Sequence, residues 1–184
     1  MSCSKENEST GSGISPSLKH SSAIDASNDF CFDLYQEAIK GESDDENVML
    51  SPLSISTALS MLVNGAEGSS ESNILNTLRL NMTTSENNEV YKELLDYLPT
   101  ADAKVKMSIA NSLWSRKGFD IEADFTNTLK DKFNTEATSL DFSDAMASKN
   151  TINNWVADAT NQKIKTIVEI LKHNWVSVLR TLIF

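Results

Sequence analysis

The segment NVMLSPLSISTALSMLVNG, residues 47–65, restricts the fold of this chain more than any other. A short apolar run enters a helix through Ser51, a residue type that caps helices, and the proline after it has a φ angle suited to the first helical position. Ile55, Leu59 and Leu62 then recur at helical spacing, and their apolar neighbours widen the stripe to nearly all sides of the helix. A helix with this pattern is typical of the buried middle of a domain, so we expect the rest of the chain to surround it.

The hydrophobic periodicity of the remaining chain predicts an α+β fold. Helices are predicted at residues 30–39, 74–78, 85–98, 125–133 and 143–159, and strands at residues 48–50, 104–115 and 136–142. The order begins with helices and then alternates strand, helix, strand and helix. This order is typical of an α+β arrangement and not of a regular succession of βαβ units.

Composition divides the 184 residues into one domain and two tails. Residues 1–26 are rich in serine, lysine, glutamate and glycine, and we expect them to be a disordered tail. Residues 27–168 carry the periodic pattern, and with 40% hydrophobic residues the chain can bury one core. Residues 169–184 form an apolar tail that diverges from this pattern.

The formal net charge of −10 argues against several classes of partner. Nothing in the chain would neutralise the phosphates of a nucleic acid, and an anionic membrane surface would repel it. The chain also has no apolar stretch long enough to span a membrane. Residues 1–20 lack the apolar region of a secretory signal, so the sequence predicts a cytoplasmic location.

The residues that carry most enzyme chemistry are scarce. The only histidines are His20 and His173, so the sequence predicts neither a metal cluster nor a Ser-His-Asp set. The loop at residues 65–70 is glycine-rich but lacks the lysine of a phosphate-binding loop. Cys3 and Cys31 are too few for a disulfide framework, and we interpret both as free thiols. We therefore predict a protein that is not an enzyme and needs no metal or cofactor.

Several segments in order resemble the serpins, the serine protease inhibitor superfamily. The first, at residues 47–70, enters a helix through Ser-Pro-x-Ser-Ile and leaves it through a Gly-Ala-x-Gly turn. The second, VKMSIANSLWSRKGFDIEADF at residues 105–125, is similar to the family's strand with Ala-Asn-x-Leu-(aromatic). The segment TEATSLDFSDAMASKNTINNWVADATNQKI, residues 135–164, is similar to its next short strand and the long helix that follows. The resemblance covers residues 28 to about 168.

The resemblance ends after Val168. Before that point Gln162 stands where the family commonly has glycine. Beyond it the family continues into a strand with Asn-Ala-(aliphatic)-Tyr-Phe, whereas this chain reads EILKHNWVSVLRTLIF. The family's reactive loop lies near its C-terminus and has no counterpart here. We therefore expect a truncated serpin-like fold with the N-terminal helices and the first strands of the main sheet.

The resemblance implies a hinge region and no catalytic site. By their place in the motif, Ser51, Pro52, Ser54 and Ile55 would lie under the main sheet, at the point where it opens. Ser51 and Ser54 would supply hydroxyls to a buried hydrogen-bond cluster there.

The resemblance also implies a helix that crosses the main sheet and carries Asn153, Trp155 and Thr160. In an inhibitor of this family, the target protease cuts the reactive loop, and the cut loop inserts into the sheet as a new strand. The crossing helix must yield during that insertion.

The function implied by the resemblance is that of a serine-type endopeptidase inhibitor, which acts as a suicide substrate in its full-length form. Its partner would be a serine or cysteine protease. Because the bait residue lies in the absent loop, we expect this chain alone to be non-inhibitory. The alternative is a non-inhibitory serpin that acts as a binding or chaperone-like protein. Most of the family is extracellular, so the location stays open.

Two further expectations concern binding at surfaces. The helix at residues 85–98 has one lysine against four acidic residues, so we do not expect it to bind a glycosaminoglycan. Open strand edges, and an apolar run at residues 176–184 that lacks an assigned partner, predict a partly folded chain that self-associates.

Overall fold

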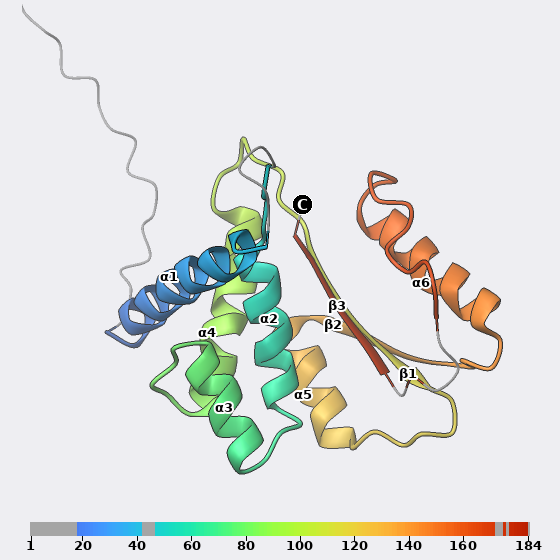
Figure 1. The fold of residues 1–184 in the computed structure, drawn as a ribbon, viewed down its shortest axis with the longest axis horizontal. Coiled ribbons are helices and arrows are strands. Elements are labelled where there is room, and N and C mark those ends of the chain that lie inside the picture. Colours follow the sequence, from blue (N-terminus) through green and yellow to red (C-terminus); the bar gives the residue numbers. More distant parts are fainter. Residues whose placement is uncertain (1–17, 42–46, 172–174, 176, 184) are drawn as a thin grey trace, which may run out of the picture.

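The computed structural model describes residues 18–41, 47–171, 175 and 177–183 (Figure 1). Its elements in chain order are α1 (Leu18–Ile39), α2 (Pro52–Val63), α3 (Ser69–Thr77), α4 (Thr84–Tyr97), the short 3-10 helix η1 (Leu98–Thr100), β1 (Ile109–Arg116), α5 (Ala123–Phe133), β2 (Thr135–Leu140), α6 (Ala145–Ala159) and β3 (Ser177–Ile183). This order confirms the predicted α+β class. No helix among the described residues is long and apolar enough to cross a membrane.

The strand β1 is the middle strand of a three-stranded sheet with the order β2-β1-β3. β2 runs parallel to β1, with Thr135 opposite Asn111, and α5 lies on the connection between the two strands. β3 runs antiparallel to β1, with Thr181 opposite Asn111. Successive side chains of β1 point to opposite faces of the sheet, and different helices cover the two faces.

The helices α2, α4 and α5 lie on one side of the sheet (Figure 1). Leu113 of β1 packs here in a buried cluster with residues of all three helices, namely Met61, Tyr91, Leu95, Leu129 and Phe133. The rings of Tyr91 and Phe133 lie 5.8 Å apart. α1 packs against α2 on the outside of this layer. The larger part of the core therefore lies on this face.

The helix α6 lies on the other side of the sheet (Figure 1). Trp114, next to Leu113 on β1, points to this side because side chains alternate along a strand. It belongs to a second buried cluster with residues of α6, of β3 and of the segments that flank α6, namely Phe142, Ile152, Val168, Leu171 and Val178.

Side-chain hydrogen bonds cap the N-termini of the helices α4 and α6. The Thr83 hydroxyl accepts a hydrogen bond from the Glu86 backbone N–H, and the Glu86 carboxylate accepts one from the Thr83 N–H. At α6, Asp144 Oδ1 accepts from the Ala147 N–H at 3.0 Å. Both caps lie within two residues of the helix starts that the sequence predicts.

The N-terminal boundary of the fold differs from the predicted one. α1 begins at Leu18, so residues 18–26 of the tail that we expected to be disordered are helical. Residues 1–17 lie outside the described part of the chain. Ala23, Ala26 and Phe30 are buried on one side of α1. Alanine contributes little to an apolar pattern, so the hydrophobic periodicity of residues 18–26 does not predict a helix.

Two stretches predicted as strands do not pair with another described strand. Residues 47–50 are irregular, and Met49 is 95% exposed. β1 begins only at Ile109, so residues 104–108 lie before the sheet. A strand forms where a neighbour satisfies its backbone groups, and an alternating pattern alone does not supply that neighbour.

Residues 177–183 of the C-terminal tail are part of the sheet, because β3 pairs with β1 along its length. The expectation that this apolar run lacks a partner is therefore wrong. Val178 and Leu182 are buried on the side of α6. A polar residue interrupts each face of the strand, with Arg180 on the α6 side and Thr181 on the other. These interruptions hide the period of two on which a strand prediction depends.

Candidate functional site

The start of α2 lies in the helix layer that packs against β3. Pro52 is the first helical residue, as predicted, but the Ser51 side chain at the N-cap position accepts no backbone hydrogen bond, so its predicted capping role is wrong. The hydroxyls of Ser51 and Ser54 instead bond to each other at 2.8 Å. Ser51 and Ile55 are exposed and Ser54 is half-buried, so these two hydroxyls do not form a buried cluster within the described chain.

The opposite side of α2 buries a set of hydroxyls that the sequence analysis did not single out. Thr57 Oγ1 donates to the Leu53 carbonyl at 2.7 Å, and Ser56 Oγ donates to the same carbonyl at 3.1 Å. Bonds of this kind satisfy a hydroxyl within its own helix and allow it to be buried. The apolar stripe, by contrast, is partly uncovered, since Leu62 is 49% exposed. The prediction that the apolar side chains of this helix are buried is therefore confirmed for Met61 and Val63 and wrong for Ile55 and Leu62.

Asn153 of α6 fixes the segment that returns from α6 toward β3. Its Oδ1 accepts hydrogen bonds from the backbone N–H groups of Ile167 at 3.0 Å and Val168 at 2.9 Å. Its Nδ2 donates to the Val168 carbonyl at 2.9 Å. One buried side chain therefore satisfies three backbone groups and holds the returning segment against α6.

Trp155 of α6 joins the helix to two strands. Its indole Nε1 donates to Glu136 Oε2 on β2 at 2.7 Å. Its ring meets Trp114 of β1 edge to face, with ring centroids 5.8 Å apart and an interplanar angle of 80°. This geometry is favourable for aromatic pairs and fixes the position of α6 over the sheet.

Thr160 closes the C-terminal end of α6. Its buried Oγ1 donates to the Val156 carbonyl at 2.8 Å and accepts from the Ile164 N–H at 3.0 Å. Gln162 follows with a φ of +63°, in the left-handed region that favours glycine. This conformation gives a physical reason for the glycine that the family commonly has at this position.

The pKa values of two charged groups near α6 are lowered. Hydrogen bonds from Ser143 hold the pKa of the Asp141 carboxyl below its usual value. Burial lowers the pKa of the Arg180 guanidinium, whose Nε has no partner in the described part of the chain. No group of His, Cys, Asp and Glu side chains among the described residues could hold a metal ion. Cys31 is a free thiol, and Cys3 lies outside the described residues.

Comparison with known proteins gives one consistent result. A family model described as serpin (serine protease inhibitor) matches residues 25–184. Human alpha-1-antichymotrypsin is 31% identical over 183 residues, which are 98% of this chain and 42% of that protein. Human neuroserpin is 33% identical over 131 residues, which are 71% of this chain and 32% of that protein.

Solved structures agree with the sequence relatives. Human thyroxine-binding globulin with a cleaved reactive loop superimposes with a TM-score of 0.82 at 32% identity, covering 90% of this chain and 50% of that one. Cleaved kallistatin in complex with heparin superimposes with a TM-score of 0.80 at 28% identity, covering 88% of this chain and 49% of that one.

The chain belongs to the serpin family, the family of serine protease inhibitors. It spans half or less of the length of the relatives that it matches. The resemblance, the partial serpin-like fold and the protease-inhibitor family are therefore confirmed. The match also extends through the tail at residues 169–184, which the motif comparison had left outside.

Proposed function

We propose that this chain is the N-terminal part of a serpin that inhibits a serine or cysteine protease by inserting its cut reactive loop into the main sheet. The observation that carries the proposal is the second edge of β3. β3 pairs with β1 on one side, and no described strand pairs with its other side. Unpaired backbone N–H and C=O groups along such an edge allow an extended segment to add as a strand.

In this proposal α6 is the cover that yields when the loop inserts. It is held over the sheet by the buried packing of Ile152, by the contact of Trp155 with Trp114 and by one hydrogen bond to the side chain of Glu136. Asn153 and Thr160 tie the returning segment to α6, so the helix and that segment are expected to move as one unit.

Ser51, Pro52, Ser54 and Ile55 form the hinge region in this proposal. The Ser51–Ser54 hydrogen bond leaves each hydroxyl oxygen able to take part in another one, because a hydroxyl donates once and accepts twice. The remaining half of the family fold would supply these partners and cover Ile55. In this proposal residues 1–184, tested alone, are expected neither to catalyse a reaction nor to inhibit a protease.

A chimera tests this proposal. Residues 1–184 are joined to the part of human alpha-1-antichymotrypsin that the chain does not match, so that the product has a reactive loop. We expect the chimera to form an SDS-resistant complex with chymotrypsin. We expect residues 1–184 alone to form none with trypsin, chymotrypsin, elastase or cathepsins.

Ser54→Leu in this chimera tests the hinge. It is expected to cost roughly 1–3 kcal/mol, because the partners of the hydroxyl are left unpaired, and to raise the inhibition stoichiometry. Ser72→Leu on α3 is the matched control, since Ser72 is exposed and its hydroxyl donates to the Gly68 carbonyl, just before its own helix. An unchanged stoichiometry and melting temperature in Ser54→Leu would remove Ser54 from the hinge.

A binding protein without inhibitory activity is the second candidate. It is favoured by the similarity to human thyroxine-binding globulin, which was solved in complex with its ligand and is 32% identical. If the chimera is cut by chymotrypsin and forms no complex, its sheet does not accept the loop. That result would support the second candidate over the first.

Two surface properties belong to this proposal. Although kallistatin was solved with heparin, α4 of this chain carries Lys92 against Glu86, Glu89, Glu93 and Asp96, so we expect no retention on a heparin column at physiological salt. The outer edges of β2 and β3, with which no described strand pairs, are expected to make the chain self-associate, which sedimentation at increasing concentration would detect.

A further inference from the structure

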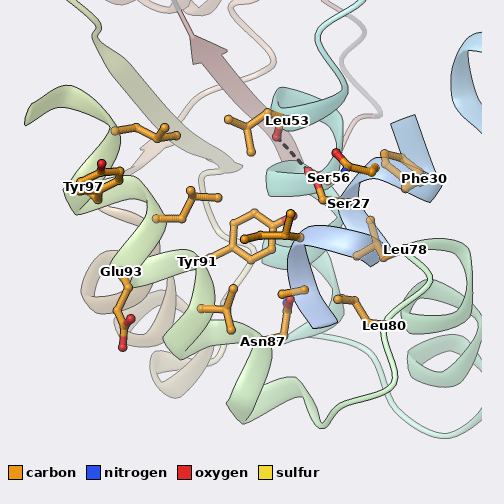
Figure 2. A pocket seen from close by; sticks show the side chains of 16 residues that line it. Ser27, Phe30, Leu53, Ser56, Leu78, Leu80, Asn87, Tyr91, Glu93 and Tyr97 are labelled. Atoms are coloured by element: carbon orange, nitrogen blue, oxygen red, sulfur yellow. Dashed lines mark hydrogen bonds between the residues drawn. The ribbon is translucent and has the colours of Figure 1, made fainter. Parts of the chain in front are cut away.

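A cavity of about 430 Å³ lies between α1, α2 and α4 (Figure 2). The cavity lies on the side of the helix layer that faces away from the sheet, and no residue of β3 or α6 lines it. The half-exposed side chains of Ile24 on α1 and Tyr97 on α4 line it, so it is open to solvent between these two helices. Its volume is within the range of pockets that hold small molecules.

The lining of this cavity is apolar and almost without charge. Leucines, a valine, an isoleucine and aromatic rings make up most of it. Of the described residues that line it, only Glu93 is charged, and its side chain is exposed. Burial raises the pKa of the Tyr91 phenol, so the phenol is neutral at physiological pH. An anion inside the cavity would find no opposite charge among the described lining residues.

One amide in the lining has no partner. The Asn87 side chain is fully buried, lies in the wall that α4 contributes (Figure 2), and neither its Nδ2 nor its Oδ1 has a hydrogen-bond partner among the described residues. A buried amide without partners costs free energy, so such a group is rare in a folded protein.

The neighbouring Asn88 is also a buried amide of α4, but its side-chain hydrogen bonds are satisfied. Asn88 Nδ2 donates to Asn64 Oδ1 at 2.7 Å, and Asn64 Nδ2 donates to Asn88 Oδ1 at 3.0 Å. This reciprocal pair joins the end of α2 to α4. Asn87 makes no such contact and lines the cavity instead.

We propose that this cavity binds an uncharged, apolar small molecule through a carboxamide head group that pairs with Asn87. Because both polar atoms of Asn87 are buried, its side chain must rotate toward the cavity to meet the ligand. The head-group carbonyl then accepts from Nδ2, and the head-group N–H donates to Oδ1, so that both unpaired atoms of Asn87 are satisfied at once. The apolar part of the ligand lies against the leucine and valine side chains of α2 and α4. This role is independent of protease inhibition, because it uses no residue of the sheet.

Calorimetric titration of residues 1–184 with decanamide tests the proposal. Decanamide is expected to bind saturably, and decanoate, whose head group is charged, is expected to bind at least tenfold more weakly. Asn87→Leu keeps the side-chain size and removes the amide. It is expected to weaken decanamide binding by about tenfold, the factor for one or two lost hydrogen bonds, and to leave the melting temperature of the free protein equal or higher.

Asn88→Leu is the matched control. It is expected to lower the melting temperature, because Asn64 loses its partner, and to leave decanamide affinity unchanged. An NMR measurement on the chain without substitutions completes the test. Nuclear Overhauser contacts are expected between decanamide and the methyl groups of Val90 and Leu53. Absence of saturable binding and of these contacts would overturn the proposal. Equal affinity for decanamide and decanoate, or equal losses in the two variants, would overturn the role of Asn87.

Discussion

The two faces of the three-stranded sheet are covered in different ways. On one face, α2, α4 and α5 contribute a cluster in which Met61, Leu129 and Phe133 have no exposed surface. On the other face, α6 and the segments that flank it cover the sheet, and this cover relies on polar contacts of Asn153 and Trp155 as well as on apolar burial. The first face holds the strands together by packing from several elements. The second face is covered by one helix and the segments that flank it.

Phe133→Ala is expected to have the largest effect, because it opens a cavity in the more extensively packed face. The loss should be about 3–5 kcal/mol of unfolding free energy, measured by urea denaturation followed by circular dichroism. Phe32→Ala on α1 is the control. Because Phe32 is 66% exposed, this substitution should change the unfolding free energy by about 0.5 kcal/mol or less. Equal effects of the two changes would contradict the assignment of the main core to this face.

Asn153→Ala is expected to loosen the cover and leave the other face intact. It leaves three backbone groups at Ile167 and Val168 without a partner, at a cost of about 2–3 kcal/mol that is largely local. Hydrogen exchange of these amides should speed up, while the amides of α5 keep their protection. The adjacent exposed Asn154→Ala is the control and should change neither. Uniform loss of protection across both faces would mean that they unfold together.

Trp155→Phe is expected to have a smaller effect on the same face. It keeps an aromatic ring against Trp114 and removes the hydrogen bond to Glu136, at a cost of about 0.5–1.5 kcal/mol. Glu136→Gln keeps an acceptor at this place and should cost less. Hydrogen exchange of the α6 amides measures both. If the double variant equals the sum of the single ones, the two side chains do not interact in solution.

Gln162→Gly should have the smallest effect, and it should stabilise the chain. Glycine relieves the left-handed backbone at this residue, for a net gain of about 0.5–1 kcal/mol. Gln36→Gly within α1 is the matched change at an exposed helical position, where the same substitution should destabilise by about 1 kcal/mol. The opposite signs are visible in thermal unfolding, and a loss of stability in both variants would refute the strain at Gln162.

The sequence alone predicts the elements better than it predicts which side of each element is buried. Periodicity places α2 and α5 because a helix shows its period in the chain itself. It cannot show that α2 buries Thr57 and exposes Leu62, because that choice depends on which layer is present next to the helix. β3 escapes prediction because Arg180 and Thr181 interrupt its two faces.

The same limit applies to the candidate sites. The family motif leads to Asn153, Trp155 and Thr160, but their partners lie elsewhere in the chain, and only the structure identifies them. Asn87 gives no signal at all, since a polar residue on an acidic helix is typical of a surface position. Its burial follows from the way α1 and α2 pack around α4.

The strand order β2-β1-β3 has a consequence for synthesis on the ribosome. β1 leaves the ribosome first, and β2 follows after one short helix and can cover one edge of β1 at once. The other edge of β1 stays unpaired until β3 is synthesised, after the whole of α6 and its returning segment. At a translation rate of about 5–20 residues per second, this delay lasts several seconds. During that time, the middle strand of the nascent chain presents an unpaired edge to chaperones and to neighbouring nascent chains.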